Sequence, residues 1–163
     1  MSDADAAFML TLLNEPSWLR FIGDRGVRTI DDARNYIVQG PAVMYASLGF
    51  GLCIVESKDL ACPMGICGLM KRDYLDAVDI GFAFLPAYWG QGYAYEAAAA
   101  VLNFAKADLG LKRILATTRV ENVASQKLLE KLGLRFERLM GHPDGDRDLR
   151  VYAIDDPGGF PRI

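Results

Sequence analysis

Two glycines, Gly90 and Gly92, flank Gln91 immediately before an alanine-rich run that is typical of a helix. In a tight turn at a helix N-terminus, exposed backbone N–H groups and the positive end of the helix dipole form a site for an anion. Glycine allows phosphate oxygens to approach the backbone closely. The segment lacks the Lys-Ser/Thr pair of a nucleotide P-loop and the third glycine of a dinucleotide-binding motif. Alone, it leaves an anion site and an ordinary strand-to-helix turn both open.

Histidine and cysteine offer little support for nucleophilic or metal chemistry. His142 is the single histidine, and the cysteines, Cys53, Cys62 and Cys67, lack CxxC spacing. Nothing in their spacing indicates a metal site or a Cys-His nucleophile pair with an orienting group, so we expect no metal. We interpret the cysteines as small hydrophobic core residues in a reducing compartment.

Composition excludes several classes of partner. The chain has 163 residues, with 18 Lys and Arg against 21 Asp and Glu, a formal net charge of -3 and a pI near 5.1. General attraction to nucleic acid or to an anionic membrane is therefore not expected. The apolar run at residues 97–102 is too short to span a bilayer, and the N-terminus carries acidic residues where a signal peptide needs basic ones. We predict one soluble, cytoplasmic domain over residues 1–163.

Four helices are predicted from apolar spacing and from residues that begin or end helices. They cover residues 6–13, 29–37, 93–109 and 122–132. Thr29 can cap the second helix together with Asp32, and Gly40-Pro41 is expected to end it. Glycines 110 and 133 follow the third and fourth helices, where a residue tolerant of positive φ is expected.

Short apolar runs between turn residues predict the strands. Residues 50–56, 65–70 and 78–85 read as three consecutive antiparallel strands, followed by strands at 113–118, 135–140 and 149–154. The order of elements is helices, meander, helix, strand, helix and hairpin. This order predicts an α/β sandwich in which helices flank a mixed sheet.

Two blocks of sequence together resemble one known family. The first block contains Asp79-Ile80-Gly81-Phe82, Pro86, Trp89-Gly90-Gln91-Gly92-Tyr93-Ala94 and Glu96-Ala97, and the second contains Arg119, Asn122, Ser125 and Leu128-Leu129-Glu130-Lys131-Leu132-Gly133. Their order and spacing resemble the RimJ/RimL-like branch of the GNAT superfamily of acetyltransferases. The resemblance covers residues 12–154.

The resemblance implies the GNAT acyl-CoA N-acyltransferase fold, with a mixed, mostly antiparallel sheet splayed around the cofactor. It also implies acetyl-CoA as cosubstrate. In this arrangement the 89–94 loop binds the pyrophosphate, and the pantetheine arm fills the gap beside the 78–85 strand. A backbone N–H of a nearby strand polarises the thioester oxygen. The implied cofactor-binding residues are Phe82, Phe84, Trp89, Gly90, Gln91, Gly92, Tyr93, Ala94 and Asn122.

Structural roles remain open for several of these positions. Asn122 begins a helix and can act as a plain N-cap. Trp89, with its neighbour Tyr88, can simply cover the core, as aromatic residues often do. Phe82 and Phe84 share one face of a strand and can pack inside while their backbone groups bind a ligand.

The implied reaction is direct attack of a primary amine, on a protein N-terminus or a small molecule, on the acetyl thioester in a ternary complex. Asp79 stands where relatives often carry a Glu and is the candidate base, with a solvated carboxylate as the alternative. Many members have a Tyr as acid where this chain has Leu129, so Ser125, one turn earlier, is the candidate acid. Alternatively, Ser125 supports the first helical turn, and the protein is a degenerate CoA-binding module without turnover.

The chain is also expected to depart from the family pattern before its first helix. Relatives usually have a first strand before the first helix, and this chain is expected to lack it. A sheet edge is then exposed unless another segment or the partner in a homodimer covers it. The amine acceptor is expected near residues 14–29 and 140–150. Acidic residues in the second segment, Asp144, Asp146 and Asp148, can attract a cationic amine or can be ordinary solvated charges.

Overall fold

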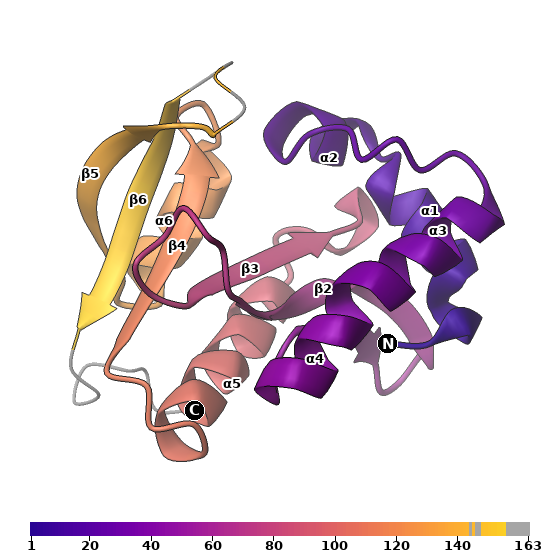
Figure 1. Ribbon diagram of the computed structural model, residues 1–163, viewed down its shortest axis with the longest axis horizontal. Helices are drawn as coiled ribbons and strands as arrows, with labels where there is room; N and C mark the ends of the chain where they lie inside the picture. Colours follow the sequence, from indigo (N-terminus) through magenta and orange to yellow (C-terminus); the bar gives the residue numbers. More distant parts are fainter. Residues whose placement is uncertain (144, 146–147, 156–163) are drawn as a thin grey trace. The chain divides into compact units, whose positions relative to one another are not determined.

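The computed structural model describes residues 1–143, 145 and 148–155 (Figure 1). The chain divides into two compact units. The first consists of Met1–Gly68 and Phe82–Ala94, and the second of Leu69–Gly81 with the described residues from Tyr95 onward. One domain over residues 1–163 stays a prediction.

The first unit opens with helices, as the apolar spacing predicts. A 3₁₀ turn, η1 (Asp3–Asp5), leads into α1 (Ala6–Leu13), whose predicted span is confirmed. Helix α2 (Pro16–Phe21) follows and was not predicted, although Pro16 at its first position is a recognised helix start.

Helix α3 (Ile30–Ile37) has the predicted cap. The N–H of Asp32 donates to the Thr29 hydroxyl at 3.1 Å, and the N–H of Thr29 donates to the Asp32 carboxylate at 2.9 Å. The two bonds satisfy backbone donors that the helix itself leaves without partners.

The prediction that Gly40-Pro41 ends this helix is wrong. The chain continues through a π-helical turn, η2 (Val38–Ala42), into α4 (Val43–Leu48), and Gly49 ends the helix with φ 75°. In a regular α-helix, proline lacks the N–H donor and its ring clashes with the carbonyl four residues earlier. The wider π turn accommodates Pro41 and lets the helix continue.

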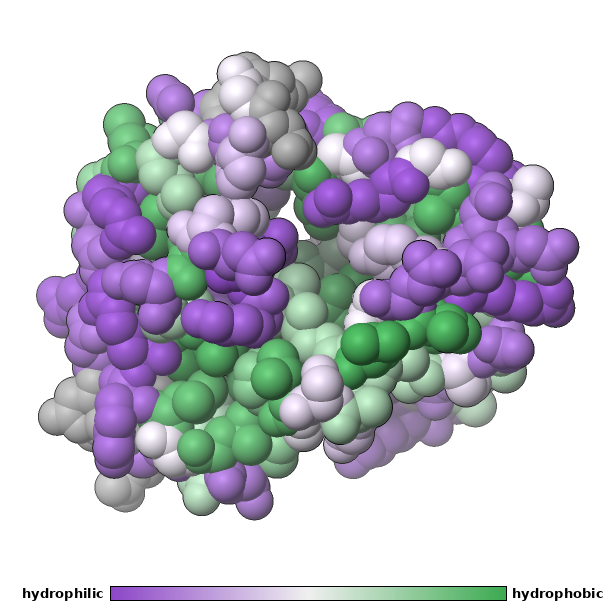
Figure 2. All heavy atoms as spheres, viewed as in Figure 1, coloured by the Kyte–Doolittle hydropathy of each residue, from purple (hydrophilic) through white to green (hydrophobic). Residues whose placement is uncertain are grey.

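Helix α4 presents apolar side chains to solvent. Val43, Tyr45 and Leu48 are all exposed, and Figure 2 shows green and pale atoms over the position of α4. The segment that leads from α3 into the first strand is therefore weakly polar on its outer surface.

Six strands form the mixed sheet that the sequence predicts. They are β1 (Leu52–Ser57), β2 (Cys62–Met70), β3 (Asp79–Phe84), β4 (Arg113–Arg119), β5 (Arg135–Gly141) and β6 (Asp148–Asp155). Their order is β1-β2-β3-β4-β6-β5. The β1–β2, β4–β6 and β5–β6 pairs are antiparallel, whereas β3 and β4 are parallel. No strand precedes α1 in the described part of the chain, and β1 and β5 are the edge strands.

Two further helices connect the strands. A 3₁₀ turn, η3 (Pro86–Tyr88), and the glycine loop lead from β3 into α5 (Tyr93–Ala107), and α6 (Val123–Lys131) connects β4 to β5. Gly110 follows α5 with φ 63°, as expected for a residue that ends a helix. Among residues 1–143, 145 and 148–155, no helix combines the length and apolar character needed to cross a membrane.

Each unit has its own apolar core. In the first unit, buried side chains of α1, α2 and α3, with Trp18 and Ile37 among them, pack with Ile66 of β2. In the second unit, Leu75 packs with Leu115, Val151 and Ala153. Burial of these apolar side chains stabilises each unit and fixes the strands that carry the candidate site residues.

Candidate functional site

The glycine loop that follows β3 has the backbone conformation required for a close approach to a ligand. Gly90 and Gly92 adopt φ values of 72° and 91°, which L side chains rarely adopt. A Cβ atom placed on either glycine would meet no other atom within 4 Å, so the space above both residues is open. Both glycines are also exposed, and α5 begins directly after Gly92.

Side chains of the same loop hold it against the end of β3. The indole N–H of Trp89 donates to the Phe84 carbonyl at 2.7 Å, and the Gln91 amide donates to the Ala87 carbonyl at 2.8 Å. Trp89 is 53% exposed and is therefore not part of the buried core. Its polar edge anchors the loop while its ring stays accessible.

Backbone donors of the loop remain available for a ligand. Within the first unit, as far as it is described, no backbone hydrogen bond uses the N–H of Gly90, Gln91 or Gly92. Tyr93 and Ala94, which open α5, are half-buried. Unpaired N–H groups at the positive end of a helix are the donors that bind phosphate oxygens in proteins.

A tyrosine pair lies beside this loop. The rings of Tyr88 and Tyr93 meet edge to face with centroids 6.2 Å apart, and the Tyr88 hydroxyl lies 3.4 Å from the Cys62 sulfur. The hydrogen bond with Cys62 raises the pKa of Tyr88 above its ordinary value. Tyr88 is therefore neutral at physiological pH and adds no negative charge beside an anion site.

The two phenylalanines of β3 are buried to different extents. Phe84 is 6% exposed and Phe82 is half-buried. The N–H of Leu85, directly after the strand, donates to the Met64 carbonyl of β2 at 3.0 Å. Packing of Phe84 inside the first unit is thus confirmed, and a backbone role for either residue stays a prediction.

Asn122 and Ser125 meet at the start of α6, in the second unit. The Ser125 N–H donates to the Asn122 side-chain oxygen at 3.2 Å, which makes Asn122 the N-cap of the helix. The Ser125 side chain is half-buried, and its hydroxyl makes no hydrogen bond to another residue that the structure describes. One turn later, Leu129 is 1% exposed and fills the core.

Asp79 opens β3 and is almost completely buried, with 1% of the residue exposed. The interpretation as a solvated carboxylate is therefore wrong. The Arg72 guanidinium donates through Nε to Asp79 Oδ2 at 2.9 Å, whereas Oδ1 has no partner in the described chain. Burial raises the pKa of the Asp79 carboxyl above its ordinary value, and the charge of Arg72 partly opposes this shift.

Arg72 was not singled out by the sequence analysis. Its guanidinium lies 5.8 Å from the Tyr74 ring centroid, and the Tyr74 ring lies 6.5 Å from that of His142. The only available signal was a basic residue seven positions before Asp79, across a turn. A turn of this kind can bring the two charges together, but its conformation was not evident from the residue types.

The structure does not bring Asp79 and Ser125 into contact. Asp79 pairs with Leu115 in the parallel β3–β4 register, and the N–H of Leu115 donates to the Val78 carbonyl at 2.9 Å. Leu115 lies four residues before the end of β4 at Arg119, or roughly 13 Å along the strand. Ser125 comes after that end of β4, in α6. Asp79 therefore lies beside Leu115 within β4, whereas Ser125 lies beyond the C-terminal end of that strand.

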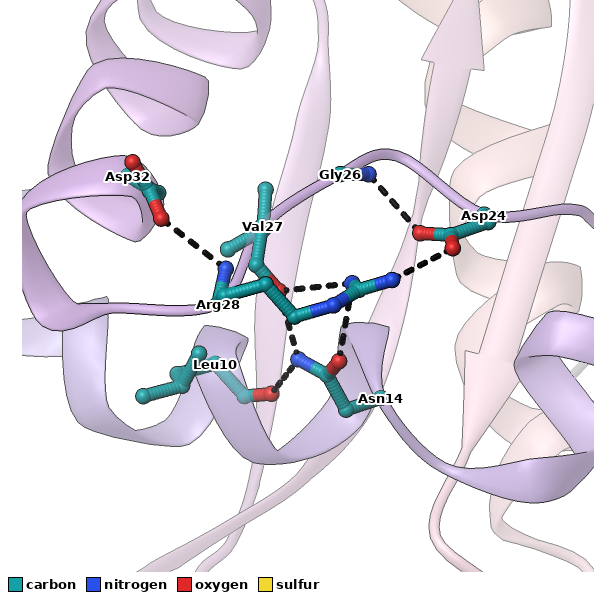
Figure 3. A network of polar contacts seen from close by, with 7 residues as sticks. All are labelled: Leu10, Asn14, Asp24, Gly26, Val27, Arg28 and Asp32. Atoms are coloured by element: carbon teal, nitrogen blue, oxygen red, sulfur yellow. Dashed lines mark hydrogen bonds and ion pairs between the residues drawn. The ribbon is translucent and has the colours of Figure 1, made fainter.

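The region expected to shape the acceptor site is held together by a polar network in the first unit (Figure 3). The Asn14 amide donates to the carbonyls of Leu10 and Val27 at 2.8 and 2.9 Å. The Arg28 guanidinium in turn donates to the Asn14 side-chain oxygen at 3.1 Å and pairs with Asp24 at 2.5 Å. These bonds tie the loop between α2 and α3 to the end of α1.

The remaining predicted positions contribute less. Cys67 is buried and Cys62 half-buried, but Cys53 is exposed, so its assignment to the core is wrong. Cys53 lies on an edge strand, where a side chain has a neighbouring strand on one side only. In the part of the chain that the structure covers, no group of three His, Cys, Asp or Glu residues can hold a metal. Asp148 is exposed at the start of β6, whereas Asp144 and Asp146 lie outside the described residues.

Similar proteins were found both by sequence and by fold. Residues 1–135 match the family model of the acetyltransferase (GNAT) domain. The chain is 26% identical over 163 residues to the uncharacterized N-acetyltransferase YoaA of Bacillus subtilis, covering 96% of this chain and 91% of that protein.

Two similar solved structures contain coenzyme A. RimL, a ribosomal L7/L12 alpha-N-protein acetyltransferase, has a TM-score of 0.81 at 18% identity, covering 96% of this chain and 91% of that one. The spermidine N-acetyltransferase of Vibrio cholerae, solved with CoA and spermine, has a TM-score of 0.78 at 17% identity, covering 96% and 92%. At these identities, both likenesses show the fold.

Proposed function

The chain belongs to the acetyltransferase (GNAT) family, and we propose that it transfers the acetyl group of acetyl-CoA to a primary amine by direct attack in a ternary complex. The observation that carries this proposal is the loop before α5. Gly90 and Gly92 hold positive φ angles with open space above them, and their N–H groups make no backbone bond within the described first unit. This arrangement suits the pyrophosphate of coenzyme A.

Residues around the loop extend the cofactor site in the proposal. Trp89 and Gln91 hold the loop through their bonds to β3 and η3, and Tyr93 and Ala94 supply the first turn of α5. Backbone groups of Phe82 and Phe84 pair with the amides of the pantetheine arm, as an added strand would. Asn122 contacts the same arm in addition to capping α6.

Acetyl-CoA supplies an activated acyl group, and the chain must manage two protons. Asp79, whose Oδ1 atom has no partner in the described chain, takes the proton of the amine by relay through water, because its carboxyl is almost completely buried. Ser125 donates a proton to the departing thiolate, since its hydroxyl is not committed to another described residue.

Two classes of acceptor fit this chemistry. RimL acts on a protein N-terminus and the Vibrio cholerae enzyme on spermidine, by their names. An α-amino group has a pKa of about 8 and an alkyl amine one near 10.4, so the former needs less help from a base at neutral pH. A carboxylate buried against Arg72 is a weak base, which favours a protein N-terminus over an alkyl amine.

Calorimetric titration with coenzyme A tests the cofactor site. Gly92→Ala adds a Cβ atom where phosphate oxygens would approach and should weaken affinity at least about tenfold. Gly110→Ala is the matched control, because Gly110 also has positive φ and open space but follows the other end of α5. Gly110→Ala should bind coenzyme A with the same affinity as the unmodified protein. An equal loss of affinity in both variants would contradict the proposal that the loop binds the cofactor.

Release of free CoA from acetyl-CoA, measured across a panel of peptides and polyamines, tests turnover. Asp79→Asn and Ser125→Ala should each lower kcat by about 10²-fold while leaving CoA affinity intact. The kcat loss in Asp79→Asn should persist at pH 9 for a polyamine but shrink for a peptide N-terminus, which is already deprotonated there. CoA binding with no turnover on any acceptor would instead favour the degenerate binding module.

A further inference from the structure

Two cysteines face one another across the antiparallel strands β1 and β2. Cys53 of the edge strand is the direct partner of Cys67 in the register, between the pairs Leu52–Gly68 and Ile54–Ile66. Residues directly opposite each other in an antiparallel pair have their side chains on the same face of the sheet. Both cysteines belong to the first unit, and both are free thiols.

The spacing of such a pair suits a disulfide. Directly opposite residues have Cα atoms about 4.5 or 5.5 Å apart, and both values fall within the roughly 4.4–6.8 Å range of natural disulfides. Their Cβ atoms, about 4.5–5.5 Å apart, must approach by up to about 1 Å. Because β1 is an edge strand, it can move this far without displacing a second neighbour.

The two thiols differ strongly in access to solvent. Cys53 is exposed, whereas Cys67 is 2% exposed. Burial, together with the nearby Cys53, raises the pKa of the Cys67 thiol to about 12. Oxidants in solution therefore reach Cys53 first, and Cys67 reacts with the oxidised Cys53 rather than with the oxidant itself.

We propose that Cys53 and Cys67 form a reversible cross-strand disulfide when the protein meets hydrogen peroxide. The Cys53 thiolate attacks one peroxide oxygen, the O–O bond breaks, and the departing hydroxide takes the displaced thiol proton to become water. The Cys67 sulfur then attacks the Cys53 sulfenic sulfur, the S–O bond breaks, and the leaving hydroxide takes the Cys67 proton. In sum, two thiols and one peroxide give one disulfide and two waters.

The third cysteine is excluded by its place in the sheet. Cys62 pairs in register with Ser57, and its sulfur contacts the Tyr88 hydroxyl. Oxidation of the full chain should thus consume two thiols and leave one. The disulfide encloses the part of the β1–β2 hairpin that contains the register irregularity between Val55 and Glu56. A covalent link there restricts slippage of β1 along β2.

The test is peroxide treatment of the reduced full-length protein, followed by thiol counting, intact mass and peptide mapping. We expect the thiol count to fall from three to one, the mass to drop by two hydrogen atoms, and the mapped peptides to join Cys53 to Cys67. The melting temperature should rise by roughly 5 °C and return to its original value with dithiothreitol. Cys62→Ser should form the same link with the same rise in melting temperature, and its thiol count should fall from two to none.

Variants at the pair separate this outcome from others. Cys53→Ser should abolish the link and the rise in melting temperature, and Cys67→Ala should leave Cys53 to gain oxygen atoms or to cross-link two chains. In the unmodified protein, a covalent dimer through Cys53 or stable sulfinic acid at Cys53 would overturn the proposal. Mapping of the unmodified protein decides the question even if Cys67→Ala fails to fold.

Discussion

Replacing Arg72 with methionine should destabilise the protein in a strongly pH-dependent manner. Methionine keeps much of the side-chain volume but removes the guanidinium that donates to Asp79 at 2.9 Å. The Asp79 carboxylate is then buried, 1% exposed, with neither oxygen paired to a cation. Removing one partner of a buried ion pair costs about 3–5 kcal/mol. For a chain of this length, that loss lowers Tm by roughly 6–20 °C.

The sign of the pH dependence follows from the protonation of Asp79. Without Arg72, burial raises the pKa of Asp79 in the folded protein further above its unfolded value near 3.9. Protonation therefore favours the folded state of the variant. The penalty should be smallest near pH 4, grow as pH rises through the folded pKa of Asp79, and be complete above it.

Urea denaturation at pH 5 and pH 8 measures the effect, with Asp79→Asn and the double variant as companions. Asp79→Asn should cost only about 1–2 kcal/mol at either pH, because the Arg72 side chain is 28% exposed and retains contact with water. In the double variant no buried charge remains, so it should be more stable than Arg72→Met at pH 8. Equal losses for Arg72→Met at both pH values would refute the reasoning.

Three further substitutions, two of them with a comparison variant, have expected outcomes. Gly68→Ala places a Cβ atom 2.1 Å from the Gly51 carbonyl oxygen. We therefore expect the free energy of unfolding, measured by chemical denaturation, to fall by about 2–4 kcal/mol. Gly26→Ala is the comparison: its Cβ atom would have open space, so it should cost at most about 1 kcal/mol. Asn122→Ala removes the cap of α6 and should cost about 1 kcal/mol, and Asn122→Asp, which keeps the acceptor oxygen, should restore most of it. Leu129→Tyr places a hydroxyl and extra volume at a residue that is only 1% exposed. Circular dichroism melts should therefore show a marked loss of stability. An unchanged Tm would count against the burial of Leu129.

Much of the fold follows from local patterns in the sequence. Apolar spacing located α1, and the Thr29–Asp32 capping box located the start of α3. The glycine loop was predicted because Gly90 and Gly92 combine a turn with a helix start, and its open backbone agrees with that prediction. These features depend on neighbours within a few residues, which a single sequence displays.

Features that depend on tertiary contacts were not predictable in the same way. The burial of Asp79 depends on the packing of β3. Its ion pair with Arg72 depends on the conformation of the turn between the two residues. The exposure of Cys53 depends on β1 being an edge strand, which is a property of strand order. The continuation of the helix beyond Pro41 depends on a π turn, for which residue types give no clear signal.

The π turn also sets the phase of the segment that follows it. Ala33, Ile37 and Pro41 are buried at intervals of four, yet Tyr45, the next position in that series, is 56% exposed. A π turn contains about one residue more than an α-helical turn, which rotates everything downstream by about 100°. Deletion of one residue between 38 and 42 would restore an α-helical turn and leave the face of the Tyr45 position nearly unchanged, because the missing residue and the lost π turn shift the phase in opposite directions. The π turn therefore helps to decide which side chains of α4 meet solvent, because the same residues in an uninterrupted α-helix would be rotated by about 100°.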